Sequence, residues 1–421
     1  MKIVRPRRLV AIAAAAACFG ALASAVPAGA RANTAGEYVA VAPTRILDTR
    51  VGNGAPIGPI GPTGRSTFVD LQVTGRGGIP TSGAVAVVMN VTVASPTVES
   101  YLSVWPTGED RPVVSSLNFV PTQTVPNLVT VKLGAGGKVS FFNPLGNADV
   151  LADVVGFYDD ASITGGWYNP LTPSRSLDTR SGIGAPASPL GAGGSLTLQV
   201  TGRNGVPAAS QVSAVAINVT AVEPTGTGFV TVWPSGDKPN VSNLNFVAGR
   251  TIANLVIVGV SSTGTINFFN EAGNTNLIGD VVGWFDKTGS TGLVFTPVSP
   301  VRAVDTRTGN GAPIGSDQGP WAPPVVGAHL DTAKVKAIVM NVTATETTAD
   351  SYFTVYPANV TTRPDASNLN WKAGQTVPNL VMSPVSPTGV AGTDPGLTAV
   401  YNFRGQAHLV MDVVGYFSTA P

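Results

Sequence analysis

The hexapeptide Arg-x-x-Asp-Thr-Arg occurs three times in this sequence and combines carboxylate and guanidinium groups at a fixed spacing. The copies read RILDTR at 45–50, RSLDTR at 175–180 and RAVDTR at 302–307. Each copy is followed, later in its repeat, by an aspartate inside an apolar run. For the first copy this residue is Asp153, in LADVVGF. Two carboxylates such as Asp48 and Asp153 could form the acid–base pair of a glycoside hydrolase. Alternatively, an arginine of the hexapeptide could form a bidentate ion pair with the later aspartate.

The ion pair is the favoured interpretation. A bare carboxylate among buried residues would cost several kcal/mol, and the hexapeptide arginines are the basic residues that recur with equal regularity. Arginine pairing would also lower the pKa that a general acid needs to have raised. We therefore predict a structural clasp in which Arg45 or Arg50 reaches Asp153, Arg175 or Arg180 reaches Asp280, and Arg302 or Arg307 reaches Asp412. The middle aspartates are expected to cap the turn that follows them: Asp48, Asp178 and Asp305.

Other catalytic or metal-binding arrangements have little support in the sequence. Its two histidines, His329 and His408, both lie in the third copy without a recognisable nucleophile context. The single cysteine is Cys18, and no Asp-rich loop has calcium-binding spacing. We expect no catalytic residue, metal or cofactor.

An aromatic residue followed by proline recurs in each copy, at Trp105, Trp233 and Tyr356. An exposed ring at such a turn could stack on a sugar, which makes these three residues the candidate ligand-binding site. The competing interpretation is that each ring packs on its own turn or between sheets. It is favoured because large aromatic side chains are mostly buried in folded proteins.

Asparagines recur at four equivalent places in each copy. Because asparagine is disfavoured in strands, we expect these side chains to satisfy buried backbone groups at bulges or turns. A ligand-binding row of amides is the alternative. The residues are Asn90, Asn118, Asn127, Asn143, Asn218, Asn245, Asn254, Asn270, Asn341, Asn370, Asn379 and Asn402.

These motifs belong to a repeat of domain length. Asn90, Asn218 and Asn341 lie 128 and then 123 residues apart, which predicts three homologous domains at 31–160, 161–287 and 288–421. Segments such as TFVDLQVT alternate apolar and polar residues, and Gly and Pro punctuate the chain. We predict an all-β protein of three tandem antiparallel β-sandwich domains, jelly-roll-like, with small β-barrels as the alternative.

The first thirty residues are predicted to be a secretory signal peptide. Four basic residues precede or open an apolar run, which ends in Ala28-Gly29-Ala30. A membrane anchor is the competing interpretation, but the run is Ala-rich and ends in a cleavable pattern. Without this segment the chain has 21 basic and 24 acidic residues. We therefore expect a secreted protein with no membrane span after cleavage and no nucleic-acid partner.

The series LDTR, VTGRGGIP, NVTV, SSLNFV, TVPNLVTV and ADVVGFY resembles a tandem β-repeat of secreted actinobacterial proteins, where the repeat stands alone or beside hydrolase and peptidase modules. The resemblance implies an accessory extracellular β-domain. The third copy departs from it by replacing VTGR with AHLDTAKVKAI. We expect a non-catalytic, surface-associated module that binds polysaccharide or cell wall weakly at several sites. The alternative is a spacer or assembly unit that meets other surface proteins, and a polysaccharide hydrolase is third.

Overall fold

The structure is a computed structural model that describes residues 35–420 apart from 63, 65–66, 309–311, 317–320, 324–329, 331–333 and 388–395. The chain divides into two units, Met1–Ala32 and Asn33–Pro421, and the described residues belong to the second. The predicted signal peptide, Cys18 and His329 lie outside the described residues. Within these, the second unit consists of β-strands, with one short 3-10 turn and no α-helix.

The first repeat supplies eight strands: β1 (Tyr38–Asp48), β2 (Phe68–Gln72), β3 (Ala84–Ala94), β4 (Ser100–Pro106), β5 (Leu117–Phe119), β6 (Val125–Lys132), β7 (Lys138–Phe142) and β8 (Asp149–Asp159), with the 3-10 turn η1 (Ala135–Gly137) before β7. They form two antiparallel sheets. The inner sheet has the order β1-β8-β3-β6, and the outer sheet has the order β2-β7-β4-β5.

The second repeat follows the same plan with β9 (Trp167–Asp178), β10 (Ser195–Gln199), β11 (Val212–Val222), β12 (Gly228–Trp233), β13 (Leu244–Phe246), β14 (Ile252–Gly259), β15 (Thr265–Asn270) and β16 (Asn276–Asp286). Its inner sheet has the order β14-β11-β16-β9. Its outer sheet has the order β10-β15-β12-β13.

The third repeat contains β17 (Val294–Asp305), β18 (Ile314–Gly315), β19 (Ala337–Thr345), β20 (Ser351–Pro357), β21 (Leu369–Trp371), β22 (Val377–Pro384), β23 (Thr398–Asn402) and β24 (Gln406–Ser418). The inner sheet has the order β17-β24-β19-β22, with the short β18 also paired to β24. Among the described residues, the outer sheet has three strands in the order β21-β20-β23.

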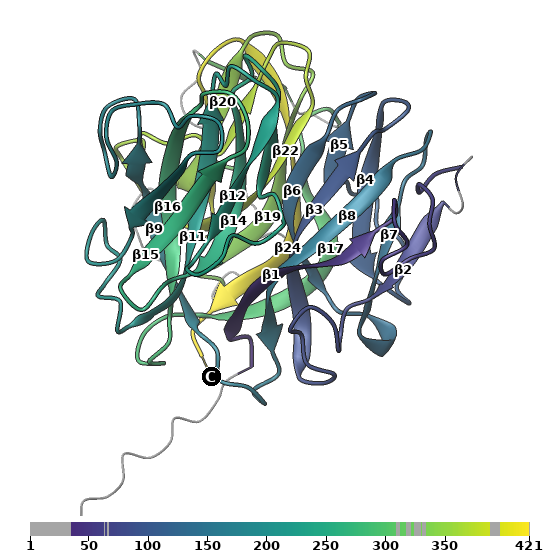
Figure 1. Ribbon diagram of the computed structural model, residues 1–421, viewed down its shortest axis with the longest axis horizontal. Coiled ribbons are helices and arrows are strands. Elements are labelled where there is room, and N and C mark those ends of the chain that lie inside the picture. Colours follow the sequence, from purple (N-terminus) through teal and green to yellow (C-terminus); the bar gives the residue numbers. More distant parts are fainter. Residues whose placement is uncertain are drawn as a thin grey trace, which may run out of the picture. The chain divides into compact units, whose positions relative to one another are not determined.

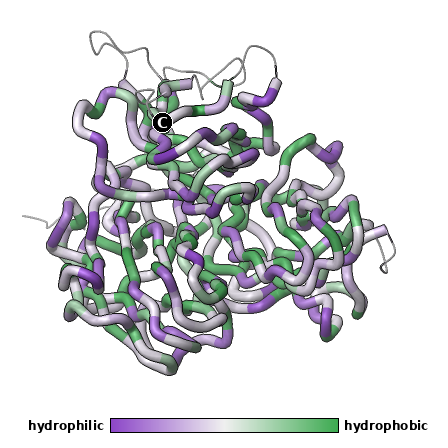
Figure 2. Tube along the Cα trace, turned by 90° about the horizontal axis from the view of Figure 1, so that it is seen from above, coloured by the Kyte–Doolittle hydropathy of each residue, from purple (hydrophilic) through white to green (hydrophobic). Residues whose placement is uncertain are grey.

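Central strands such as β3 are apolar on both faces because each face meets a different cluster. Val87, Met89 and Val91 pack into the cluster between the two sheets of the first repeat. Ala86 and Val88 point the other way, into a cluster that gathers residues from all three repeats. This explains why AVAVVMNVTVA is a nearly continuous apolar run, while hydrophobic and hydrophilic residues alternate along much of the remaining trace in Figure 2.

The shared cluster determines how the repeats are organised. Each repeat has an apolar cluster between its own two sheets, and the inner sheets of all three meet in one interior. The six sheets have a propeller-like arrangement, with β17 and β24 next to β8 (Figure 1). The all-β, antiparallel prediction is confirmed. The prediction of three sandwich domains is wrong, because the second apolar face of each inner sheet must be buried and is buried against the other repeats.

The glycine of the closing DVVGFY motif allows the interior to close. Gly156 of β8 lies under the ring of Tyr38, where an added Cβ would stand 2.2 Å from the tyrosine hydroxyl oxygen. The Tyr38 hydroxyl donates a hydrogen bond to the carbonyl of Val155 at 3.1 Å. Aromatic contacts then join the repeats in turn, with ring-centroid distances of 4.5 Å for Tyr38–Phe285, 4.3 Å for Tyr168–Phe417 and 4.1 Å for Tyr158–Phe295.

Candidate functional site

The first arginine of each hexapeptide is paired with the buried aspartate of the last strand. Arg45 Nε donates to Asp153 Oδ1 at 2.8 Å, and Nη2 donates to Oδ2 at 3.0 Å. The antiparallel register of β1 and β8 places these two residues opposite each other. The same bidentate pairs form in the other repeats, at 2.8 and 3.3 Å for Arg175–Asp280 and at 2.8 and 3.2 Å for Arg302–Asp412.

The second arginine of each hexapeptide has a different partner. Arg50 binds Asp48 through Nε and Nη2 at 2.9 and 2.7 Å, and its backbone N–H donates to the same carboxylate. Equivalent bonds join Arg180 to Asp178 and Arg307 to Asp305. The middle aspartate therefore accepts the backbone N–H two residues ahead, in the manner of an Asx turn.

The two carboxylates of each clasp respond differently to their surroundings. The side-chain hydrogen bond from Arg50 lowers the pKa of Asp48, and the matching bond from Arg307 lowers the pKa of Asp305 to about 2. Burial raises the pKa of Asp153, while Arg45 acts in the opposite direction. Both oxygens of Asp153 already accept hydrogen bonds from Arg45. The geometry uses these carboxylates as ion-pair partners.

The aromatic residues that the sequence offered as ligand contacts are buried. Trp105 and Trp233 are each 7% exposed and Tyr356 is 3% exposed. The turn after each tryptophan covers it, because the indole N–H of Trp105 donates to the carbonyl of Glu109 and that of Trp233 donates to the carbonyl of Gly236, both at 3.1 Å. The prediction that these rings stack on a sugar is corrected: their faces are used in packing.

A different set of aromatic residues lies partly exposed on the outer sheets. Phe142, Phe269 and Tyr401 occupy equivalent positions, since each pairs across the sheet with the hydroxyl residue Ser103, Thr231 or Thr354. A basic side chain lies over each ring. The distances to the ring centroid are 4.1 Å for Arg111 over Phe142, 4.7 Å for Lys238 over Phe269 and 4.1 Å for Arg363 over Tyr401.

Sequence reasoning missed these three cation–aromatic pairs, although a signal was present. Each cation is followed by proline, as in Arg111-Pro112, and each aromatic residue is followed by a recurring asparagine, as in Phe142-Asn143. The exposure of a ring depends on how the next turn folds, which the spacing of Trp and Pro does not reveal.

The recurring asparagines hold the loops that carry the cations. The Asn90 side chain donates to the carbonyl of Ser242 at 2.6 Å. Asn218 donates in the same way to Ser367, and Asn341 to Ser115. A second set bonds within its own repeat and across to the next: Asn127, Asn254 and Asn379. The amides thus satisfy buried backbone groups, as the first of the two interpretations expects.

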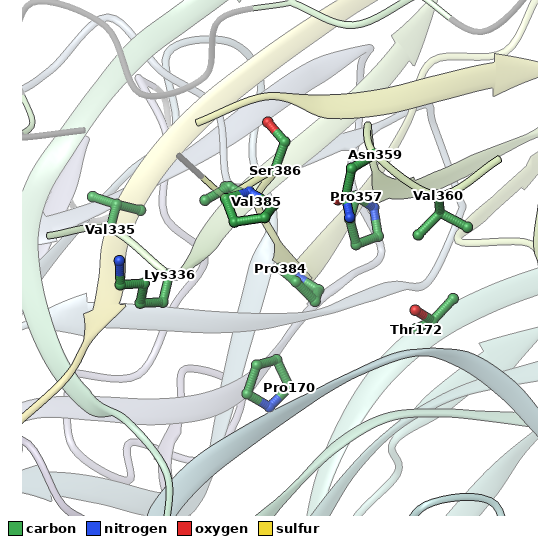
Figure 3. Close-up of a pocket in the computed structure, with 11 residues that line it drawn as sticks. Pro170, Thr172, Val335, Lys336, Pro357, Asn359, Val360, Pro384, Val385 and Ser386 are labelled. Atoms are coloured by element: carbon green, nitrogen blue, oxygen red, sulfur yellow. The ribbon is translucent and has the colours of Figure 1, made fainter. Parts of the chain in front are cut away.

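A small groove lies at the seam between the second and third repeats (Figure 3). It has a volume of about 300 Å³. Pro170 and Thr172 of β9 form one side, opposite Lys336, Pro384 and Val385 of the third repeat. A larger groove of about 530 Å³ occupies the equivalent seam between the third and first repeats, with Pro297 in place of Pro170. Both grooves lie between packed repeats, and no residue of the cation–aromatic pairs lines either of them.

Within the described ranges, no group of three or more His, Cys, Asp and Glu side chains could hold a metal ion. His408 is next to Thr306, whose hydroxyl lies 3.0 Å from the ring Nδ1. In the part of the chain that the structure describes, no helix is long and apolar enough to cross a membrane.

No family model matches the chain, and no curated protein is significantly similar to it. Among solved structures, the chain is similar to one described as the triple jelly roll fold and turret assembly in an archaeal virus. The two chains are 9% identical, the alignment covers 92% of this chain and 91% of the other, and the TM-score is 0.18. A score of that size supports no conclusion about this protein.

Proposed function

We propose that this protein is a secreted, non-catalytic, surface-associated module that binds polysaccharide or cell wall weakly at three equivalent sites. The observation that carries the proposal is the basic side chain lying over a partly exposed aromatic ring on every outer sheet. Aromatic rings offer apolar faces and edges to sugars, and a neighbouring cation adds polar contacts to hydroxyl or acidic groups.

Three weak sites on one rigid unit support useful affinity. Each cation belongs to the loop between the fourth and fifth strands of its repeat, and this loop is fixed at its far end by an asparagine of a neighbouring repeat. The sites are therefore held at constant separations. A polymeric ligand that meets one site raises the effective concentration of its other segments at the remaining sites.

A rigid spacer or assembly unit is the second candidate. The closed set of hydrogen bonds between repeats and the shared apolar interior favour it, since both make the unit stiff. In this function the exposed edge strands of the outer sheets, such as β2 and β10, would meet other surface proteins.

Co-sedimentation of the purified chain with peptidoglycan, cellulose, chitin, xylan and whole cell walls tests the proposal. We expect saturable retention by at least one of them, and loss of retention in the triple variant Phe142→Ala, Phe269→Ala, Tyr401→Ala. The matched control is Val113→Ala with Leu145→Ala, which removes apolar atoms from exposed positions outside the three rings. Retention that the triple variant leaves unchanged, or no retention by any polymer, would favour the spacer.

A further inference from the structure

We propose that the outer face of the third repeat is a binding site for an acidic glycan, one that carries carboxylate or phosphate groups. The site consists of Tyr352, Tyr401 and Phe403 with Arg363 and Arg404. This inference rests on the proposed glycan-binding function and assigns its charged ligand to one of the three outer sheets.

The outer sheet of the third repeat carries three aromatic rings that are at least partly exposed. Tyr352 of β20 and Phe403, which follows β23, are stacked with ring centroids 4.9 Å apart and planes inclined by 15°. Phe403 is 38% exposed. On the same side of the sheet, Tyr401 is across from Thr354. The result is a row of rings along which a linear glycan can lie.

Two guanidinium groups border this row. Arg363 lies 4.1 Å from the centroid of the Tyr401 ring, and Arg404 lies 4.8 Å from the centroid of Phe403. Both arginines are exposed. Within the part of the chain that the structure describes, neither is paired with a carboxylate, whereas Arg302 and Arg307 of the same repeat are. Their N–H groups are available to an external anion.

The other two repeats carry an acidic neighbour where the third does not. Asp110 precedes Arg111 and Asp237 precedes Lys238, but Thr362 precedes Arg363. The acidic residue after Arg363-Pro364 is Asp365, which contacts Arg175 of the second repeat through its side chain at 3.5 Å and its carbonyl at 2.8 Å. The Asp365 side chain is itself exposed, so the stronger positive balance of the third site comes from its second cation, Arg404, where the first two repeats have Leu145 and Ala272.

Backbone contacts preorganise both arginines. The loop that carries Arg363 is fixed where Asn218 donates to the carbonyl of Ser367 at 2.6 Å, and the backbone N–H of Arg404 donates to the Ser351 hydroxyl at 2.8 Å. A planar guanidinium beside an aromatic ring suits a ligand that combines a sugar ring with an acidic group. Its parallel N–H donors match carboxylate and phosphate oxygens, and the ring packs against the sugar.

The test compares polygalacturonate with its methyl-esterified form, which has the same backbone without the charge, and adds a phosphate-bearing wall polymer. Affinity of the full chain is measured by isothermal titration calorimetry at two salt concentrations. We expect the polyanion to bind, with an affinity that falls as salt rises. The double variant Arg363→Gln, Arg404→Gln should lower it about tenfold or more. The matched control, Arg250→Gln with Lys287→Gln, removes two exposed basic residues that lie outside the three sites and should change it by less than about threefold.

The outcomes separate the two proposals. Equal binding of charged and esterified polymers, or equal losses in the two double variants, would overturn the acidic-glycan site and leave the glycan-binding function standing. No binding of any polymer would overturn both. Preference between the carboxylate and phosphate polymers identifies the source of the anion. Thermal melts of each variant show whether the fold is retained.

Discussion

The side-chain amide of Asn90 in the first repeat donates to the backbone carbonyl of Ser242 in the second repeat at 2.6 Å, across 152 residues of chain. The carbonyl oxygen of the same side chain accepts a hydrogen bond from Asn254 at 2.9 Å. One side chain thus joins two segments of a neighbouring repeat. Equivalent contacts from Asn218 and Asn341 make this relationship threefold.

Asn90→Ala should destabilise the protein by about 1–3 kcal/mol, because the substitution leaves the buried Asn254 amide with one partner fewer and removes the bond to Ser242. Chemical denaturation of the full chain measures the loss. Asn240→Ala, at an exposed position in the second repeat, is the control and should change stability by less than about 0.5 kcal/mol. Equal effects of the two substitutions would contradict the assigned role.

Asp153→Ala should cost roughly 3–5 kcal/mol, because it leaves the Arg45 guanidinium without its bidentate partner in a partly buried site. Asp153→Asn keeps one acceptor oxygen and should cost less. The comparison is Asp350→Ala, which breaks the exposed pair with Lys372 and should lower stability far less, because solvent screens that pair. A melting temperature that Asp153→Ala leaves unchanged would show that the clasp contributes nothing to stability.

Gly156→Ala should destabilise the shared interior by about 1–3 kcal/mol, because the added methyl group would overlap the ring of Tyr38. Gly259→Ala places the same group where its nearest neighbours lie 3.8 Å away. Differential scanning calorimetry of the two variants separates overlap from the general effect of replacing glycine. The assignment fails if both variants melt at the same temperature.

The middle aspartate of each hexapeptide should make the free energy of unfolding depend on pH in the acid range. Arginine contacts hold the pKa of Asp48, Asp178 and Asp305 below its usual range, and that of Asp305 at about 2. A carboxyl group with a lowered folded-state pKa contributes stability that is present above its unfolded value, roughly 3.9, and is lost as the pH falls through the folded value. Melting temperatures of wild type and Asp305→Asn, measured from pH 5 to pH 2, should therefore converge in acid.

The buried aspartates contribute with the opposite sign. Because burial raises the pKa of Asp153, Asp280 and Asp412, the folded state takes up protons at these residues more readily than the unfolded state does. Their contribution is present below the unfolded value and is lost as the pH rises through the folded value. Asp305→Asn isolates the middle carboxylate from this background. A pH profile of the variant that parallels wild type would rule out the assigned effect of Arg307.

The sequence allowed the all-β class, the repeat and the pairing of a hexapeptide arginine with Asp153 to be predicted. It left open which arginine makes the contact, because that depends on the bulged register that sets Arg45 opposite Asp153. The nearly continuous apolar run AVAVVMNVTVA indicated a strand covered on both faces, and this is confirmed, but the run did not show what covers the second face. Alternation shows that Ala86 and Val88 need an apolar neighbour, but it does not say that the neighbour is another repeat.

The candidate site was harder to predict for a related reason. Trp105 has the residue type expected of a sugar contact, yet its exposure is decided by the turn that folds over it. Arg111 and Phe142 are distant in sequence and meet only because the loop after β4 returns over β7. Recurrence of a basic residue before proline was the available clue, and it carries meaning only once the strand pairing is known.

The asparagine contacts run from the first repeat to the second, from the second to the third, and from the third back to the first. Such head-to-tail contacts close after three steps, so the unit is in effect a cyclic trimer joined into one polypeptide. The closure fixes the copy number. A chain of two repeats would leave the donor amide of one repeat and the acceptor carbonyl of the other facing solvent at an open seam. A fourth repeat would find every donor amide and acceptor carbonyl of this set already paired. The order of the repeats along the chain then does not determine these contacts, so moving the termini to the link between β8 and β9 would preserve the asparagine contacts between the repeats.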